Sequence, residues 1–216
     1  MAARVNGDAV ADVRRDQMLA AAATLIAERG FSDTRIADVA GRVGASPALV
    51  IYYFGTKDSL LTEALRWSER SFYAATEEML RTTPTIRRRL ETLVEWTLVP
   101  DVPTSMTSDW GLWFDLWAQA FRHPGVNKDR AELDAQWRDL ISRVVQAGVD
   151  DGEIAAVDVE TFAIMWCSLL DGLVVQVALE DPVVGVERAC QVALDVAFKE
   201  LGVNTGKPRR RTAKKA

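Results

Sequence analysis

Apolar residues recur at spacings of three and four along almost the whole chain, which is the period of an amphipathic α-helix. Alternation of apolar and polar residues, which would indicate β-strands, never continues long enough to propose a strand. With 49% hydrophobic residues, the chain also has enough apolar surface for a packed core. The sequence therefore predicts an all-α protein; the clearest helical stripes are Met18, Ala22, Leu25 and Ile26, then Ile36, Val39, Ala40 and Val43, then Ile86, Leu90, Leu93 and Leu98.

Glycine, proline and short polar clusters interrupt this pattern and divide the chain into nine expected helices. The first three helices are short and closely spaced, whereas the later ones are long. We expect an N-terminal arm and three-helix domain over residues 1–56, followed by a larger helical bundle over residues 57–201. The expected helices span residues 12–29, 35–43, 47–53, 57–81, 85–98, 108–122, 128–149, 158–180 and 186–201.

The charge is distributed unevenly, although the net charge at pH 7 is only −5. Residues 1–66 contain eight basic and eight acidic residues, residues 67–201 contain 12 and 23, and residues 202–216 contain six and none. Such asymmetry indicates different partners for different regions, so the acidic total does not exclude binding to nucleic acid. The basic segment 202–216 cannot bury enough surface to offset the entropy lost on ordering, so we expect a disordered tail.

The residues needed for catalysis or metal binding are scarce. The chain contains one histidine, His123, and two cysteines, Cys167 and Cys190, which are too few for a disulfide scaffold and too far apart for a zinc pair. We therefore expect no enzymatic activity, no metal and no cofactor. Residues 1–11 lack the pattern of a secretory signal, so we expect a cytoplasmic protein.

Residues 34–58 read TRIADVAGRVGASPALVIYYFGTKD and contain the signals of two short, tightly joined helices. Thr34 is expected to cap the first helix, Gly44 to end it in a left-handed conformation, and Ser46 to cap the second, with Pro47 in its first turn. This arrangement is typical of a helix-turn-helix, whose second helix enters the major groove of DNA. An ordinary helical hairpin would show the same local geometry.

A longer pattern favours the first interpretation. It runs through Gly30-Phe31, Ile36-Ala37-Asp38-Val39-Ala40, Gly44-Ala45-Ser46, Tyr52-Tyr53-Phe54, Lys57 and Leu60-Leu61. This pattern closely resembles the DNA-binding domain of the TetR family of transcriptional regulators, and the bundle region resembles, less closely, the C-terminal domains of betaine-type repressors of that family. The resemblance implies a homodimer whose third helices enter successive major grooves of a near-palindromic double-stranded DNA operator.

The resemblance also implies a role for individual residues by their position. Many family members carry Lys, Gly and Thr where this chain has Pro47, Ala48 and Leu49, so its recognition helix offers few hydrogen-bond donors, and readout of DNA shape gains importance. Tyr53 fits a position in the core equally well. The implied contacts are Thr34 and Arg35 to phosphate, Ser46, Pro47, Ala48 and Leu49 to base edges, and Tyr52, Tyr53 and Lys57 to the DNA backbone.

Tryptophans are concentrated in the expected bundle. Trp110, Trp113 and Trp117 share one helix face, and three indoles on one face leave gaps between helices, although ordinary core packing is the alternative. Glu95 and Asp115 would attract a cationic ligand held by cation–π contacts, unless they are solvated surface residues. We predict a pocket for a small-molecule effector lined by Trp96, Trp113, Trp117, Phe162, Trp166 and Leu169.

Residues 161–179 read TFAIMWCSLLDGLVVQVAL, which is apolar on almost every side and long enough for a membrane span. Asp171, Gln176 and the absence of a basic flank argue against a membrane. A helix of this kind is instead buried on two sides, one against its own bundle and one against a partner. The family resemblance implies that this helix and the last one pair with their copies in a four-helix dimer interface.

Taken with the resemblance, these features predict a sequence-specific transcriptional regulator, in the simplest case a repressor released from its operator by a small-molecule effector. One alternative is an architectural DNA-binding protein that uses the helix-turn-helix and the basic tail without an effector. Another is an all-helical protein-interaction module that contains a hairpin similar to a helix-turn-helix.

Overall fold

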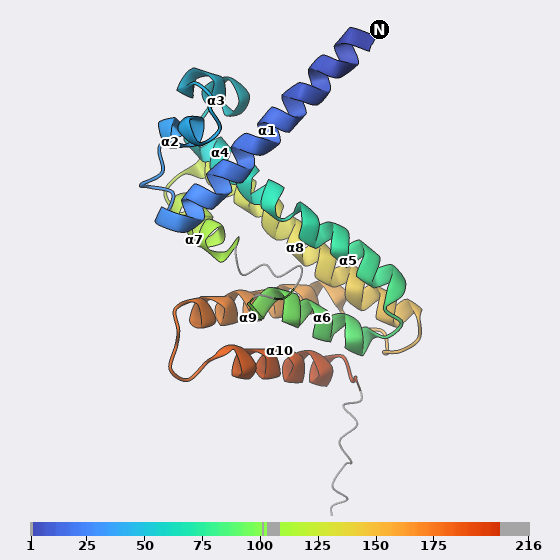
Figure 1. Cartoon of the computed structure of the whole chain (residues 1–216). Coiled ribbons are helices and arrows are strands. Elements are labelled where there is room, and N and C mark those ends of the chain that lie inside the picture. Colours follow the sequence, from blue (N-terminus) through green and yellow to red (C-terminus); the bar gives the residue numbers. More distant parts are fainter. Residues whose placement is uncertain (1, 101, 103–108, 204–216) are drawn as a thin grey trace, which may run out of the picture.

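The computed structural model describes residues 2–100, 102 and 109–203, without the side chains of residues 2–11 and 71. Within these limits every regular element is a helix, which confirms the all-α prediction (Figure 1). The helices are α1 (Ala2–Arg29), α2 (Ile36–Arg42), α3 (Pro47–Phe54), α4 (Lys57–Ser68), α5 (Arg70–Thr82), α6 (Ile86–Leu98), α7 (Trp110–Ala120), α8 (Pro124–Asp150), α9 (Val159–Ala178) and α10 (Val186–Glu200).

Most helices begin and end close to the expected residues. The helix expected over 57–81 is interrupted at Glu69, where the Ser68 hydroxyl donates to the carbonyl of Leu65 at 2.9 Å. When α4 and α5 are counted as one interrupted helix, the described residues contain nine helices, which is the number expected. Residues 2–11, expected as an arm, continue α1 as helix. The tail beyond Val203 lies outside the described residues.

The N-terminal helices do not enclose a core of their own. The cluster that contains Met18, Val39 and Leu61 also includes Leu112 and Leu116 of α7, so the head formed by α1 to α4 shares its core with the bundle. The backbones approach closely where α7 crosses α1, since a Cβ on Gly111 would lie 3.7 Å from Cα of Ala27. This shared core gives α7 direct contact with the head.

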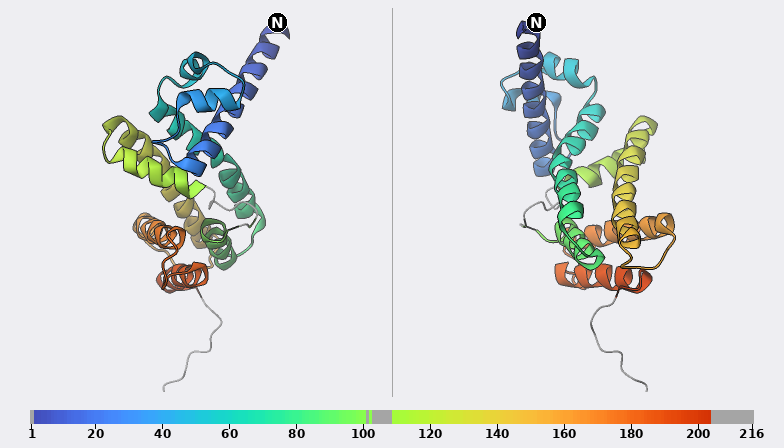
Figure 2. Two further views of the ribbon diagram at one scale, coloured as in Figure 1. Left: turned by 60° about the vertical axis from the view of Figure 1, so that its left-hand side comes forward. Right: turned by 90° about the vertical axis from the view of Figure 1, so that its right-hand side faces the viewer.

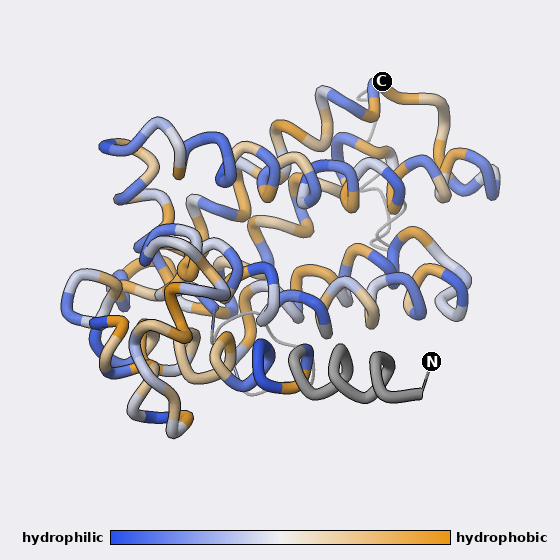
Figure 3. The backbone as a smooth tube through the Cα atoms, turned by 90° about the horizontal axis from the view of Figure 1, so that it is seen from above, coloured by the Kyte–Doolittle hydropathy of each residue, from blue (hydrophilic) through white to orange (hydrophobic). Residues whose placement is uncertain are grey.

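The second core joins α5, α6, α8, α9 and α10 around Leu90, Leu140 and Trp166. The views in Figures 1 and 2 place the head at one end of the molecule and α9 and α10 at the other, with α5 and α8 running between them. Hydrophobic and hydrophilic residues follow one another along each helix, as expected for amphipathic helices (Figure 3). The long helices α5 and α8 therefore connect the two ends.

Among the described helices, α9 has the length and apolar composition of a membrane span. It packs along α8 and α10 instead, and only part of it is covered. Met165 is 37% exposed on its outer side, and Leu179 and Val183, which follow it, are 72% and 79% exposed. The α9–α10 layer thus presents an apolar outer face.

Candidate nucleic-acid interface and ligand cavity

The turn between α2 and α3 has the predicted local chemistry. Gly44 has φ +62°, the left-handed conformation that ends α2, and the Ser46 side chain accepts a hydrogen bond from the Leu49 N–H at 3.2 Å. Val39 and Val50 are fully buried where the two helices meet the head core. These contacts fix α3 with one side buried and the other free.

The outward side of α3 consists of Pro47, Ala48, Ile51 and Tyr52, which occupy one helix face. Tyr52 is 81% exposed and Ile51 is 43% exposed. Leu49, which was expected to face base edges, is half-buried against the head core. Ile51, which the sequence-based assignment did not include, also lies on this exposed face, as its spacing of four from Pro47 indicates.

The structure places Thr34 inside the head. Its hydroxyl donates to the carbonyls of Gly30 at 2.9 Å and Leu25 at 3.3 Å, and only 3% of the residue is exposed. The predicted N-cap at Thr34 is wrong by one residue, because α2 is preceded by Arg35, whose N–H donates to Asp38 at 2.9 Å. Arg35 itself is exposed. Thr34 therefore joins the loop to α1 and does not face outward.

Lys57 and Tyr53 both have intramolecular contacts. The Lys57 ammonium donates to the carbonyl of Ser32 at 3.2 Å and lies 4.2 Å from the ring centre of Phe31. An ammonium has three donors, so this bond leaves two for another acceptor. Tyr53 is half-buried against the head core, with its ring edge-on to Tyr52 at 5.7 Å.

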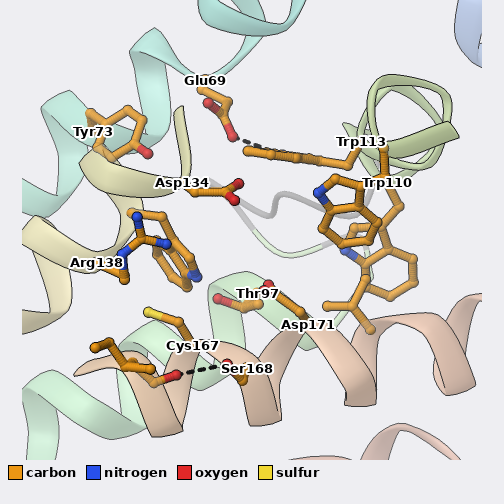
Figure 4. Close-up of a pocket in the computed structure, with 14 residues that line it drawn as sticks. Glu69, Tyr73, Thr97, Trp110, Trp113, Asp134, Arg138, Cys167, Ser168 and Asp171 are labelled. Atoms are coloured by element: carbon orange, nitrogen blue, oxygen red, sulfur yellow. Dashed lines mark hydrogen bonds between the residues drawn. The ribbon is translucent and has the colours of Figure 1, made fainter. Parts of the chain in front are cut away.

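A cavity of about 470 Å³ lies between the head and the α9–α10 layer (Figure 4). Its volume falls in the range of small-molecule sites. The lining comes from the α4–α5 junction and from α5 to α9, and comprises Glu69, Tyr73, Thr97, Trp110, Trp113, Trp117, Asp134, Trp137, Arg138, Ile164, Cys167, Ser168, Asp171 and Val174.

Two of the six predicted pocket residues, Trp113 and Trp117, line this cavity. The other four lie outside its lining because their helices present a different face to it. Trp166 is fully buried, its indole donates to the carbonyl of Ala193 at 3.0 Å, and Phe162 stacks on it. Trp96 packs against the ring of Phe72, and Leu169 packs on the bundle core.

The acidic residues at the cavity also differ from those expected. Asp115 accepts a hydrogen bond from the N–H of Phe31 at 2.7 Å, and Glu95 is exposed on α6. The carboxyl groups of the lining belong instead to Glu69, Asp134 and Asp171, and Arg138 is the one basic residue among them. The cavity is therefore aromatic and acidic.

Glu69 is the most deeply buried of these acids, with 1% of the residue exposed. Its Oε1 accepts a hydrogen bond from the indole N–H of Trp113 at 2.9 Å. Burial raises the pKa of Glu69 to about 8, Asp109 adds to this effect, and the Trp113 hydrogen bond opposes it. Burial, with a contribution from Asp134, likewise raises the pKa of Asp171 to about 6.

The described residues contain no group of three His, Cys, Asp or Glu side chains that would hold a metal ion. Burial raises the pKa of both thiols, Cys167 and Cys190, which disfavours the reactive thiolate form. The chemistry that the cavity supports is thus binding by aromatic faces, carboxyl groups and hydrogen bonds.

Comparison with known proteins gives matches over both parts of the chain. Residues 18–64 match the family "Bacterial regulatory proteins, tetR family", and residues 86–201 match the family "BetI-type transcriptional repressor, C-terminal". The transcriptional repressor KstR2 of Rhodococcus jostii is 29% identical over 68% of this chain and 71% of its own length. The regulator BetI of Pectobacterium atrosepticum is 25% identical over 88% of this chain and 94% of its own length.

The fold is also found among solved structures. A transcriptional regulator from Saccharomonospora viridis, crystallised in complex with choline, superposes with a TM-score of 0.73 at 28% identity. The alignment covers 88% of this chain and 96% of that structure. These relatives are transcriptional regulators and not enzymes.

Proposed function

The chain belongs to the TetR family of transcriptional regulators, with a C-terminal region of the BetI type, and from this premise we propose that it is a repressor released from a near-palindromic operator by a small-molecule effector. The observation that carries this proposal is the position of α7. This helix lines the cavity with Trp113 and holds the head through the bond between Asp115 and Phe31. The proposed site of action is the cytoplasm.

In the proposed complex, α3 enters the major groove. Ser46, Pro47, Ala48 and Ile51 would face base edges, and Ala48 and Ile51 would contact thymine methyl groups. The face carries no Arg, Asn or Gln for bidentate base recognition, so DNA shape would supply much of the specificity.

Contacts to phosphate would position α3 in the groove. Arg35 and Tyr52 are exposed beside it, and Tyr53 and Lys57 are half-buried at the same end of the head. We assign these four residues to the DNA backbone, which orients the protein but carries no sequence information by itself. Thr34 is left out of this set, since its hydroxyl donates within the head.

The effector that suits the cavity best is an organic cation. The indoles of Trp110, Trp113, Trp117 and Trp137 provide π-faces, and three carboxyl groups outnumber one guanidinium. The related regulator from Saccharomonospora viridis was crystallised with choline, a cation of this class. Choline is therefore the first probe for this chain.

The proposed homodimer forms through α9 and α10. Met165, Leu179 and Val183 are exposed on or beside this layer, and an apolar face of this kind is typical of a subunit interface. Two heads held at a fixed separation would then meet half-sites one helical turn of DNA apart, at about 34–36 Å. The proposed division of the chain remains an N-terminal arm and helix-turn-helix domain over residues 1–56, a ligand-binding and dimerisation bundle over 57–201 and a basic tail over 202–216.

Selection of bound sequences from random DNA tests this proposal most directly. We expect a near-palindromic site, and we expect choline to lower the affinity for it. An architectural protein would bind the site equally well with and without the effector. A protein-interaction module would give no enriched sequence.

A further inference from the structure

Unpartnered polar atoms converge on the cavity. Four buried side-chain nitrogen or oxygen atoms of the described residues have no hydrogen-bond partner, and three of them belong to the cavity lining: Oε2 of Glu69, the hydroxyl of Tyr73 and the indole nitrogen of Trp110. A buried polar group without a partner destabilises the protein, and a ligand that satisfies it would remove this penalty. The cavity therefore has a polar side that a ligand would complete.

The two oxygens of Glu69 have different surroundings. An indole N–H can only donate, so Oε1 is held as an acceptor by Trp113. Oε2 is buried and has no partner, and Figure 4 shows the Glu69 carboxyl group at the lining of the cavity with its other oxygen turned toward Trp113. A protonated carboxyl would place its hydrogen on Oε2, whereas an ionised one would present a negative charge there.

Burial, together with the charge of Asp109, favours the protonated form of Glu69 while the cavity is empty. Asp109 lies at the start of α7, Asp134 and Arg138 project from α8, and Asp171 projects from α9 (Figure 4). Tyr73, one turn along α5, is neutral. Burial and the neighbouring acid keep the proton on Glu69 at neutral pH.

We propose that Glu69 selects the charge of the effector by exchanging its carboxyl proton for the effector's positive group, which settles beside Oε2 while the proton leaves to solvent. This inference rests on the proposed organic-cation effector. A neutral analogue of the same shape would meet a protonated Glu69 and release no proton. An anion would face the lining acids without a compensating charge at this end of the cavity.

The place of Glu69 in the chain gives this exchange a structural consequence. Glu69 separates α4 from α5, and α4 begins at Lys57, beside the Phe31 loop of the head. A carboxylate that forms at this junction changes the partner of Trp113 from a neutral to a charged group, and such hydrogen bonds are stronger and shorter. The exchange therefore acts on the contact between α7 and the α4–α5 junction.

Titration calorimetry of the full chain with choline tests the proposal, using two buffers of different ionisation enthalpy. At a pH of about 7.5, where Asp171 is mostly ionised and Glu69 mostly protonated, we expect release of about three quarters of a proton per cavity. Between pH of about 6.5 and 7.5 the Kd should fall about tenfold, and it should become constant well above a pH of about 8.

Three comparisons make the test specific. The neutral alcohol in which carbon replaces the nitrogen of choline should bind without proton release and without pH dependence. Glu69→Gln keeps the shape but cannot ionise, so it should lose proton release and its preference for choline over that alcohol. Glu95→Gln removes an exposed carboxyl of α6 outside the lining and should behave as the wild type.

The outcomes separate this inference from the proposed function. Choline binding by the wild type without proton release, at an affinity independent of pH, would overturn the role of Glu69 and leave the repressor assignment intact. If neither choline nor tetramethylammonium binds at a pH of about 8.5, the inference and the cation class both fail. Sequence selection on random DNA remains an independent test of the regulator.

Discussion

The backbone N–H of Phe31 donates a hydrogen bond to Oδ2 of Asp115 at 2.7 Å, which ties the loop before α2 to the middle of α7. Trp113, two residues earlier on the same helix, donates to Glu69 at the cavity. The ring of Phe31 in turn lies 4.2 Å from the Lys57 ammonium at the start of α4. A contiguous set of contacts thus joins the cavity to the head.

Replacing Asp115 should reduce the effect of the effector on operator binding more than it reduces the affinity for the effector itself. Asp115→Ala leaves the Phe31 N–H without its acceptor, so movement of α7 would no longer be transmitted to this loop. We expect the Kd for choline in the absence of DNA to stay within a few fold. The coupling free energy, which is given by the ratio of choline affinities with and without operator, should decrease by about 0.5–2 kcal/mol.

The control for this variant is Glu95→Ala, which removes an exposed acid from α6 outside the cavity lining. It should leave the ratio unchanged. An Asp115→Ala protein whose ratio equals that of the wild type would show that coupling does not pass through this bond.

Replacing Ile51 should relax base preference at one position of each half-site. Ile51 is 43% exposed on the outward face of α3, and Ile51→Ala removes the apolar contact proposed for a thymine methyl group. We expect a loss of about 1 kcal/mol at that base pair and little change elsewhere. Binding assays with uracil in place of thymine provide the test, because uracil at the contacted position should abolish the difference between wild type and variant.

Replacing Lys57 should weaken DNA binding without changing the preferred sequence. A phosphate contact contributes charge neutralisation, so Lys57→Gln should reduce the slope of log affinity against log salt by about 0.9 for each subunit's contact. Thermal unfolding serves as the control, since Lys57 also donates to Ser32. A loss confined to one operator position would identify Lys57 as a base-reading residue instead.

A charge on the outer face of α9 should separate the proposed dimer. Met165 is 37% exposed and lies outside the cavity lining, and Met165→Glu would bury a carboxylate in the subunit interface. We expect a monomer in sedimentation measurements and a strong loss of operator affinity. The matched variant Val13→Glu, at a residue of α1 that is 59% exposed, should stay dimeric. A dimeric Met165→Glu protein would place the interface elsewhere.

Local signals account for what could be predicted from the sequence. Gly44 and Ser46 set the turn between α2 and α3 through their own backbone and side-chain chemistry, so the turn and the helix type follow from the sequence alone. The face that α9 presents to the cavity does not, because the helix is apolar on nearly all sides. Packing against α10 decides that Trp166 points away from the cavity and Cys167 lines it.

The acids of the cavity were harder to identify for a related reason. The sequence predicts one long helix over 57–81 around Glu69 and another around Asp134, both with many other charged residues, and an acid in such a helix is usually solvated. Glu69 is buried because α7, distant in sequence, covers it with Trp113. Asp115, which is close to the tryptophans in sequence, instead lies on the head side of the same helix.

Glu69 should also make the stability of the empty protein depend on pH. Its pKa is about 8 in the folded protein and 4.5 ordinarily, so between these values the folded state retains a proton that the unfolded chain has lost. The contribution of Glu69 is therefore fully favourable below a pH of about 4.5, decreases as the pH rises, and levels off above about 8. Glu69→Gln cannot ionise and lacks this dependence.

Urea unfolding of the wild type and Glu69→Gln, at the same protein concentration and from a pH of about 6 to about 9, measures how their stabilities differ with pH. The effects of titrating groups common to both proteins largely cancel in this difference. The free energy of unfolding of the wild type, relative to Glu69→Gln, should fall by about 1.4 kcal/mol per pH unit near a pH of about 6, less steeply as the pH approaches about 8, and then become constant. Parallel curves over this range would mean that Glu69 is already ionised in the empty cavity. Glu69 would then have no proton to release when a cation binds.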